Sequence, residues 1–351
     1  MQTVYPALTW DIFCTVIDNY GDAGVCWRLA HNLAQRGQSV RLWIDQPDIL
    51  AGLAPHGHER VQILPWHAPL PTTPGDVLVE AFGVHLDERV QAWRSPSSVW
   101  INLEYLSAEN YVARCHLLQS PVMSGPAAGA SKVFFYPGFT EATGGLLREV
   151  DLLAQHTAFQ TQRDDFLRSF GVTQPERPTA SLFCYEPPAL KQWLTQWQTG
   201  NILVMQGRGA SATRQALQDM PEHLVMLPWL TQSDFDRVLW ASDFNAVRGE
   251  DSLVRALWAG QPLLWHIYQQ DDNAHHDKLH AFLDWLQAPT DLRDMHYLWN
   301  GMSTGKLPAP TPHRLHEWRA CIQAARARLL QQPDLVNQLL SYVIQQRGVV
   351  L

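Results

Sequence analysis

The chain alternates short apolar runs with longer amphipathic stretches over most of its length. Apolar runs that predict strands in the first half lie at 12–17, 39–45, 61–64, 76–81 and 98–103. Runs that predict strands in the second half lie at 180–185, 201–205, 224–227, 244–247 and 262–266. Strands that alternate with helical segments are typical of open α/β sheets. The pattern therefore predicts two consecutive Rossmann-like domains.

The segment 172–178 interrupts this alternation with two prolines and a change to polar composition. Such segments commonly connect domains. We therefore expect an N-terminal domain over 1–172 and a C-terminal domain over 179–333. A last helix, about 334–351, carries spare apolar side chains, and we expect it to pack back onto the first domain.

Composition and charge narrow the class of protein. The chain has 351 residues, of which 46% are hydrophobic and 17% charged, so it can bury two cores and is not a disordered chain. Its net charge of −8, without a basic run, argues against a nucleic-acid partner. Five scattered cysteines without a CxxC pair favour a reducing, cytoplasmic setting over disulfides or zinc. Because no run reaches about 18 apolar residues, we expect no membrane association.

Two carboxylates, Asp18 and Asp22, stand in the first predicted strand-to-helix turn. Ligands of open α/β sheets bind at this edge. The segment 19–24 matches a dinucleotide-binding glycine pattern except that Asn19 replaces the first glycine. A pyrophosphate would be repelled there, by roughly 4 kcal/mol for unit charges about 4 Å apart at an effective dielectric near 20. The acids favour acid–base chemistry or a cationic substrate, while helix capping is the structural alternative for Asp22.

A second polar turn, Arg248-Gly249-Glu250-Asp251-Ser252, follows a predicted strand and opens a helix. Amides at a helix start can receive a diphosphate, and Glu250 could accept hydrogen bonds from sugar hydroxyls. The alternative is a capped helix with a solvated charge cluster.

Aromatic and amide side chains stand near two other predicted strand ends. They are Phe183, Tyr185, Gln232 and Phe235. The rings could stack a nucleobase and the amide could read its edge, whereas core packing is the alternative for each ring taken alone.

Several long motifs resemble one known family. They are Ile12-Phe13-Cys14 through Asp22, Trp100–Ser107, Phe134–Phe139 and Arg248–Ser252. The chain resembles, over nearly its full length, the EarP family of protein-arginine rhamnosyltransferases that modify translation elongation factor P. The resemblance implies an α/β fold of GT-B glycosyltransferase architecture, with two facing Rossmann-like domains and a cleft between them.

The same resemblance implies a reaction and its residues. L-rhamnose would pass, with inversion, from dTDP-β-L-rhamnose to the guanidinium of one arginine of elongation factor P, without a metal or other cofactor. The implied catalytic acids are Asp18, Asp22 and Glu250. The implied donor-binding residues are Phe183, Tyr185, Gln232, Phe235, Arg248, Glu250, Asp251 and Ser252.

The chemistry of the acceptor agrees with two neighbouring acids. A guanidinium, with a pKa above about 12, is a poor nucleophile while it is protonated. Carboxylates can hold it in a fixed geometry and take a proton as the C–N bond forms. We assign Asp22 as the general base and Asp18 as the orienting group, and the division of labour between them stays open.

Two alternative functions remain at this point. One is a GT-B enzyme that acts on another acceptor, either a small-molecule glycosyltransferase or a sugar-nucleotide epimerase. The other is a non-enzymatic module that binds a basic protein through the acidic turn. Oligomeric state, the acceptor-docking surface, lobe closure and kinetic magnitudes are not encoded in these patterns.

Overall fold

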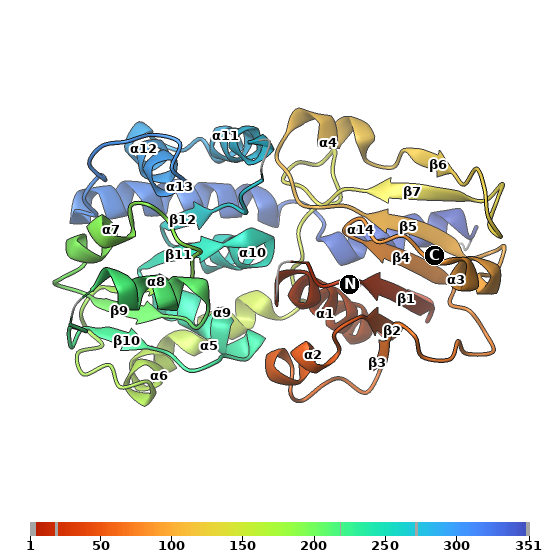
Figure 1. Ribbon diagram of the computed structural model, residues 1–351, viewed down its shortest axis with the longest axis horizontal. Helices are drawn as coiled ribbons and strands as arrows, with labels where there is room; N and C mark the ends of the chain where they lie inside the picture. Colours follow the sequence, from red (N-terminus) through yellow and green to blue (C-terminus); the bar gives the residue numbers. More distant parts are fainter. Residues whose placement is uncertain (1–4, 18–19, 218, 271–272, 349–351) are drawn as a thin grey trace. The chain divides into compact units, whose positions relative to one another are not determined.

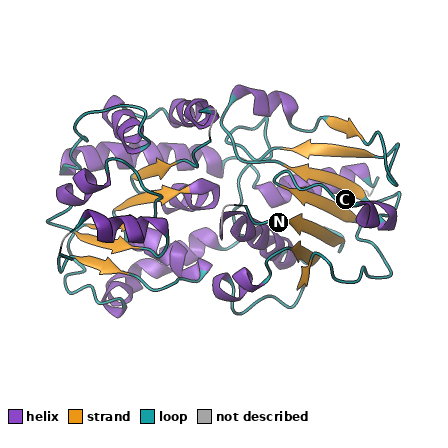
Figure 2. Cartoon of the chain, viewed as in Figure 1, coloured by secondary structure: helices purple, strands orange, loops and turns teal. Residues whose placement is uncertain are grey.

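Residues 5–17, 20–217, 219–270 and 273–348 are described by a computed structural model. The chain divides into unit 1, which combines Met1–Val150 with Gln331–Leu351, and unit 2, which is Asp151–Leu330. In both units strands alternate with helices that pack beside the sheet (Figure 2). Among the described residues, no helix combines the length and the apolar character needed to cross a membrane.

Unit 1 is an open α/β sheet with its helices (Figure 1). Its strands are β1 (Thr9–Cys14), β2 (Ser39–Ile44), β3 (Val61–Pro65), β4 (Val77–Ala81), β5 (Val99–Leu103), β6 (Gln119–Pro121) and β7 (Ser131–Phe135). Its helices are α1 (Tyr20–Gln35), α2 (Asp48–Leu53), α3 (Glu88–Trp93), α4 (Asn110–Cys115) and α14 (Leu335–Gln346). The strand order is β3-β2-β1-β4-β5-β7-β6, and the pairs are parallel except β6 with β7.

The core of unit 1 includes the last helix of the chain. Leu335, Leu339 and Val343 recur at helical spacing and belong to the buried cluster that lies on β1 and α1. The Asp334 carboxylate accepts the backbone N–H groups of Val336 and Asn337 at 3.1 and 3.0 Å, which fixes the start of α14. Residues from the end of the chain thus contribute to the core of the unit that begins the chain.

The first strand lies earlier in the sequence than its apolar run predicts. The run at 12–17 indicated the strand, but β1 ends at Cys14 and includes Asp11. The Asp11 carboxylate is fully buried because it accepts hydrogen bonds from Arg41 at 2.7 Å and from the Trp43 indole at 2.9 Å. A neighbouring strand therefore supplies the partners that let a charged residue enter β1.

Unit 2 repeats the α/β alternation. Its strands are β8 (Thr179–Leu182), β9 (Asn201–Val204), β10 (Leu224–Met226), β11 (Phe244–Arg248) and β12 (Leu263–His266). Its helices are α5 (Leu152–Phe159), η1 (Gln160–Gln162, a 3₁₀ turn), α6 (Arg163–Ser169), α7 (Leu190–Gln196), α8 (Arg208–Ala216), α9 (Gln232–Ala241), α10 (Gly249–Ala259), α11 (Ala274–Leu286), α12 (Thr290–Trp299) and α13 (Pro312–Leu330). The order β10-β9-β8-β11-β12 is parallel throughout.

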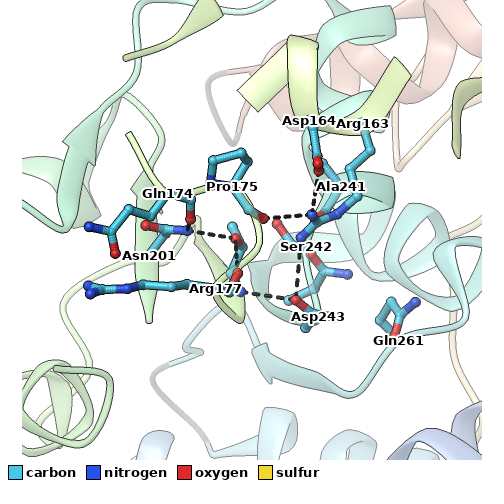
Figure 3. Close-up of polar contacts among 12 residues, drawn as sticks. Arg163, Asp164, Gln174, Pro175, Arg177, Asn201, Ala241, Ser242, Asp243 and Gln261 are labelled. Carbon is cyan, nitrogen blue, oxygen red and sulfur yellow. Dashed lines mark hydrogen bonds and ion pairs between the residues drawn. The ribbon is translucent and has the colours of Figure 1, made fainter. Parts of the chain in front are cut away.

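The boundary between the units lies at residue 150, and not near residue 172 as the proline-containing segment 172–178 predicts. The difference arises because the polar segment before β8 is bound to unit 2 (Figure 3). Arg163 donates to the carbonyl oxygens of Ala241 and Pro175, each at 2.8 Å. The Asn201 amide donates to the Gln174 carbonyl at 2.9 Å. Hydrogen bonds to side chains remote in sequence thus keep a proline-containing stretch inside the unit.

Candidate functional site

Each sheet has a topological switch point, which is a pair of neighbouring strands from which the chain continues toward opposite edges of the sheet. In unit 1 this pair is β1 and β4, because β1 is followed by β2 on one side and β4 by β5 on the other. In unit 2, β8 and β11 have this relationship. Ligands of open α/β sheets bind beyond the carboxyl ends of such a strand pair. The loops after these four strands are therefore the places to look for a site.

Asp22 lies in the first turn of α1, just beyond the end of β1. The Oδ2 atom of its buried carboxylate accepts the Ile17 backbone N–H at 2.8 Å. The neighbouring Val16 N–H donates to Asp45 Oδ1 at 3.0 Å, so two carboxylates hold the loop between β1 and α1. The predicted turn is thus already helical from Tyr20. Asp18 lies outside the described residues.

The loop after β4 contains an unusual backbone conformation. Phe82 has φ of 57°, which is an outlier for an aromatic residue and favours a constrained, functional position. Its ring stacks on Tyr105 with a centroid distance of 5.1 Å, and the Tyr105 hydroxyl donates to the Phe82 carbonyl at 3.4 Å. Nearby in sequence, burial raises the pKa of Glu104, whose carboxylate accepts from the Asn102 amide at 2.8 Å. The Trp100–Ser107 motif thus lies at this same edge.

Arg248 occupies the switch point of unit 2. It ends β11 and is only 7% exposed. Its guanidinium carbon lies 4.6 Å from the ring centroids of both Phe183 and Tyr185, which follow β8. Phe183 in turn meets Phe235 edge to face at 5.4 Å. The structure therefore brings four of the predicted donor-binding residues into one cluster, in which the rings surround a cation.

The rest of the predicted turn forms the start of α10. The Ser252 hydroxyl hydrogen-bonds the backbone N–H of Arg248 at 3.1 Å and also the Arg248 carbonyl. Glu250 forms an ion pair with Lys278 of α11, with Oε1 and Nζ 2.5 Å apart. Asp251 lies beside them in the first turn of α10. The N-cap residue, Arg248, makes no side-chain cap bond, and the Glu250 carboxylate is partly buried in its ion pair, so the alternative of a capped helix with a solvated charge cluster does not describe this segment.

Gln232 is the first residue of α9, one turn before Phe235. The Thr231 hydroxyl caps this helix by accepting the Asp234 N–H at 3.1 Å. The cap fixes the first turn of α9. Gln232 and Phe235, which is a ring of the Arg248 cluster, both lie in that turn.

Sequence reasoning missed His266, which ends β12 and is buried. Its Nδ1 atom accepts the Tyr185 backbone N–H at 3.3 Å. Burial, and then the charges of Arg208 and Arg248, lower its pKa to about 3, so the ring is neutral. Its Nε2 atom has no hydrogen-bond partner among the described residues. Because a buried neutral histidine has no local sequence signal, only the packing of β12 could show it.

Two exposed aromatic residues beyond strand ends were also missed. Trp229, after β10, is 65% exposed, and Tyr268, after β12, is 47% exposed. Tyr268 meets Tyr185 edge to face at 5.9 Å. Tyr268 thus contacts the Arg248 cluster, and an exposed ring in such a place can stack a planar ligand. Their signal in the sequence was an aromatic residue just after each predicted strand.

Metal ligands do not gather in the part of the chain that the structure describes. Within it, no group of three or more His, Cys, Asp or Glu side chains is arranged to hold a metal ion. The candidate chemistry of this part therefore comes from carboxylates, guanidinium groups, aromatic rings and helix starts.

Comparison with known proteins identifies the family of this chain. The family model described as Elongation-Factor P (EF-P) rhamnosyltransferase EarP matches residues 10–344. The protein-arginine rhamnosyltransferase of Pseudomonas putida is 44% identical, and the alignment covers 95% of this chain and 98% of that protein. Its counterpart in Pseudomonas aeruginosa is 41% identical with the same coverage.

Solved structures give the same result for the fold. A structure described as the structural basis for EarP-mediated arginine glycosylation of translation elongation factor EF-P has a TM-score of 0.66 and 33% identity, covering 98% of this chain and 100% of that one. Arabidopsis thaliana UGT89C1 complexed with UDP has a TM-score of 0.55 at 13% identity, covering 97% and 100%. The latter likeness concerns the fold alone. The chain belongs to the EarP family of EF-P rhamnosyltransferases, and it is a glycosyltransferase of GT-B architecture with two Rossmann-like units.

Proposed function

We propose that this enzyme transfers L-rhamnose from dTDP-β-L-rhamnose to a guanidinium nitrogen of an arginine on translation elongation factor P, with inversion at the anomeric carbon. The observation that carries the proposal is the buried Asp22 carboxylate at the switch point of unit 1, in a chain whose relatives are protein-arginine rhamnosyltransferases. A carboxylate there suits a cationic acceptor and disfavours a phosphate.

The acids of unit 1 act on the acceptor guanidinium. A guanidinium nitrogen forms the new C–N bond while it loses a proton. Asp22 takes that proton, and Asp18 orients the guanidinium. Asp22 is fixed for this role because the Ile17 N–H holds its Oδ2 atom at 2.8 Å.

The residues of unit 2 bind the donor and stabilise its leaving group. The bond between the anomeric carbon and the diphosphate oxygen breaks, and the leaving dTDP gains negative charge. Arg248, with the start of α10, stabilises that charge. Phe183, Tyr185, Gln232, Phe235, Asp251 and Ser252 bind the nucleotide sugar, and Glu250 binds a sugar hydroxyl. The scheme uses no metal and no other cofactor, and the reaction takes place in the cytoplasm.

Intact-protein mass spectrometry tests the proposal directly. Purified elongation factor P is incubated with the enzyme and dTDP-β-L-rhamnose, and we expect a mass gain of one deoxyhexose residue. A factor in which the acceptor arginine is replaced by lysine should gain no mass, because the site needs a guanidinium. Consumption of donor without a mass gain on the factor would point to another acceptor.

A further inference from the structure

The turn between β9 and α8 lies directly against the Arg248 cluster. Gly207, at φ of 131°, precedes α8, and a Cβ atom at its position would lie 3.9 Å from Arg248 Nη2 and 3.9 Å from Phe183 Cε2. A Cβ atom on Gly209 would lie 2.7 Å from the Cys184 carbonyl oxygen. Gly209 thus lets the start of α8 pack closely on the segment that carries the aromatic rings, and Gly207 allows the positive φ of the turn before it.

This turn brings a second guanidinium to the cluster. The Arg208 guanidinium carbon lies 5.3 Å from the centroid of the Tyr185 ring, which Arg248 also approaches at 4.6 Å. Arg208 donates from Nε and Nη2 to the two carboxylate oxygens of Glu186, at 2.8 and 2.6 Å. Burial and, after it, the charges of both arginines lower the pKa of His266 to about 3. The cluster therefore brings two guanidinium groups to one ring, with one carboxylate paired to Arg208.

One nitrogen of the Arg248 guanidinium can still donate hydrogen bonds. Its Nη1 atom is buried and has no hydrogen-bond partner among the described residues. Leaving a buried charged donor unpaired is costly, so such a group in a folded protein points to a ligand. The neighbouring α8 adds backbone N–H groups and the positive end of its dipole. Groups of this kind attract an anion.

We propose that Arg208 and the β9–α8 turn form the second half of the donor diphosphate site, of which Arg248 forms the first half. The two arginines are far apart in sequence but approach the same ring, that of Tyr185. Glu186 is the positioning residue that holds the Arg208 fork beside Tyr185 before the nucleotide binds. Held in this way, the Arg208 guanidinium then donates charge-assisted hydrogen bonds to phosphate oxygens from N–H groups other than the two that bond Glu186. This inference rests on the proposed function for the class of ligand, a nucleoside diphosphate.

Calorimetric titration of Arg208→Gln with dTDP, thymidine and inorganic pyrophosphate tests the proposal. We expect the Kd for dTDP to rise about tenfold, as for loss of one charge-assisted contact, and the Kd for thymidine to stay unchanged. Arg214→Gln is the matched control, since Arg214 is an exposed arginine in the last turn of the same helix. It should bind all three ligands like the wild type. Unchanged thymidine binding also shows that the variant is folded.

Equal dTDP affinity in Arg208→Gln and wild type would overturn the inference, as would an equal loss of thymidine and dTDP binding. Pyrophosphate separates this result from a failure of the proposed function. If the wild type bound pyrophosphate in an Arg208-dependent way but showed no preference for dTDP, the donor assignment would be wrong and the anion site would stand.

Discussion

The Oδ2 atom of Asp22 accepts the backbone N–H of Ile17 at 2.8 Å, across the start of α1. The carboxylate thus closes the loop that leads from β1, and it is also the general base that we propose. A structural contact and a proposed chemical role meet in the same side chain. This combination determines which substitutions can separate the two roles.

Asp22→Asn should abolish most of the transferase activity and leave the fold intact. The amide oxygen can still accept the Ile17 N–H, but the side chain can no longer take a proton from the acceptor. We expect the rate to fall at least about 100-fold with little change in Tm. Asp45→Asn is the control, because Asp45 holds the same loop through Val16. It should keep its rate, and a fully active Asp22→Asn would refute the base assignment.

Phe183→Ala should weaken donor binding. The centroid of the ring lies 4.6 Å from the Arg248 guanidinium carbon, so the substitution removes one of the two cation–π contacts of Arg248 with Phe183 and Tyr185. We expect the Kd for dTDP to rise about tenfold by calorimetry. Phe166→Ala removes a ring of another edge-to-face pair in unit 2 and should leave the Kd unchanged. Wild-type affinity in Phe183→Ala would remove this residue from the site.

Lys278→Met should reveal coupling with Glu250. Their ion pair is 2.5 Å long and both side chains are about one-fifth exposed, so screening is incomplete. A double-mutant cycle with Glu250→Gln should give a coupling of about 1 kcal/mol in the free energy of unfolding. The exposed pair of Arg237 with Asp234 should give about 0.5 kcal/mol or less. Glu250→Gln should lower activity in either background, and strictly additive stabilities would contradict the coupling.

The enzyme should lose stability as the pH falls below about 6.5. Burial lowers the pKa of His266 to about 3 and that of His296 to about 4, from a usual value of 6.5. The unfolded chain therefore binds protons that the folded chain does not, and the free energy of unfolding falls by up to about 1.4 kcal/mol per pH unit for each histidine. Denaturant titrations at pH 7 and pH 5 measure this.

His296→Gln should flatten that pH dependence. The Nε2 atom of the fully buried His296 ring accepts the backbone N–H of Trp265 at 3.1 Å, which it can do only while the ring is neutral. His313→Gln, at an 80% exposed side chain, should leave the slope as it is. A wild-type protein whose stability was the same at pH 5 and pH 7 would disprove the assignment of neutral, buried histidines.

The apolar periodicity of the sequence determined most of the architecture. The predicted strands at 39–45, 76–81 and 201–205 correspond to β2, β4 and β9 within one residue at each end. Every residue of β4 and β9 is buried, as are four of the six in β2, so their sequences are largely apolar runs that the local pattern can identify. The residue types after the strands likewise indicated Asp22 and the Arg248–Ser252 turn, because loops at this edge carry the chemistry of the fold.

Only the tertiary structure decided which remote side chains complete each feature. Asp11 enters β1 because Arg41 and Trp43 pair with it, and residues 151–172 join unit 2 partly through Arg163. Arg208 meets Tyr185 through the pairing of β9 with β8. These contacts join residues far apart in sequence, whereas periodicity reports only how each segment divides between core and solvent. The sequence by itself therefore determined the two α/β units and the acid of the first turn, and tertiary packing determined the unit boundary and the cation cluster.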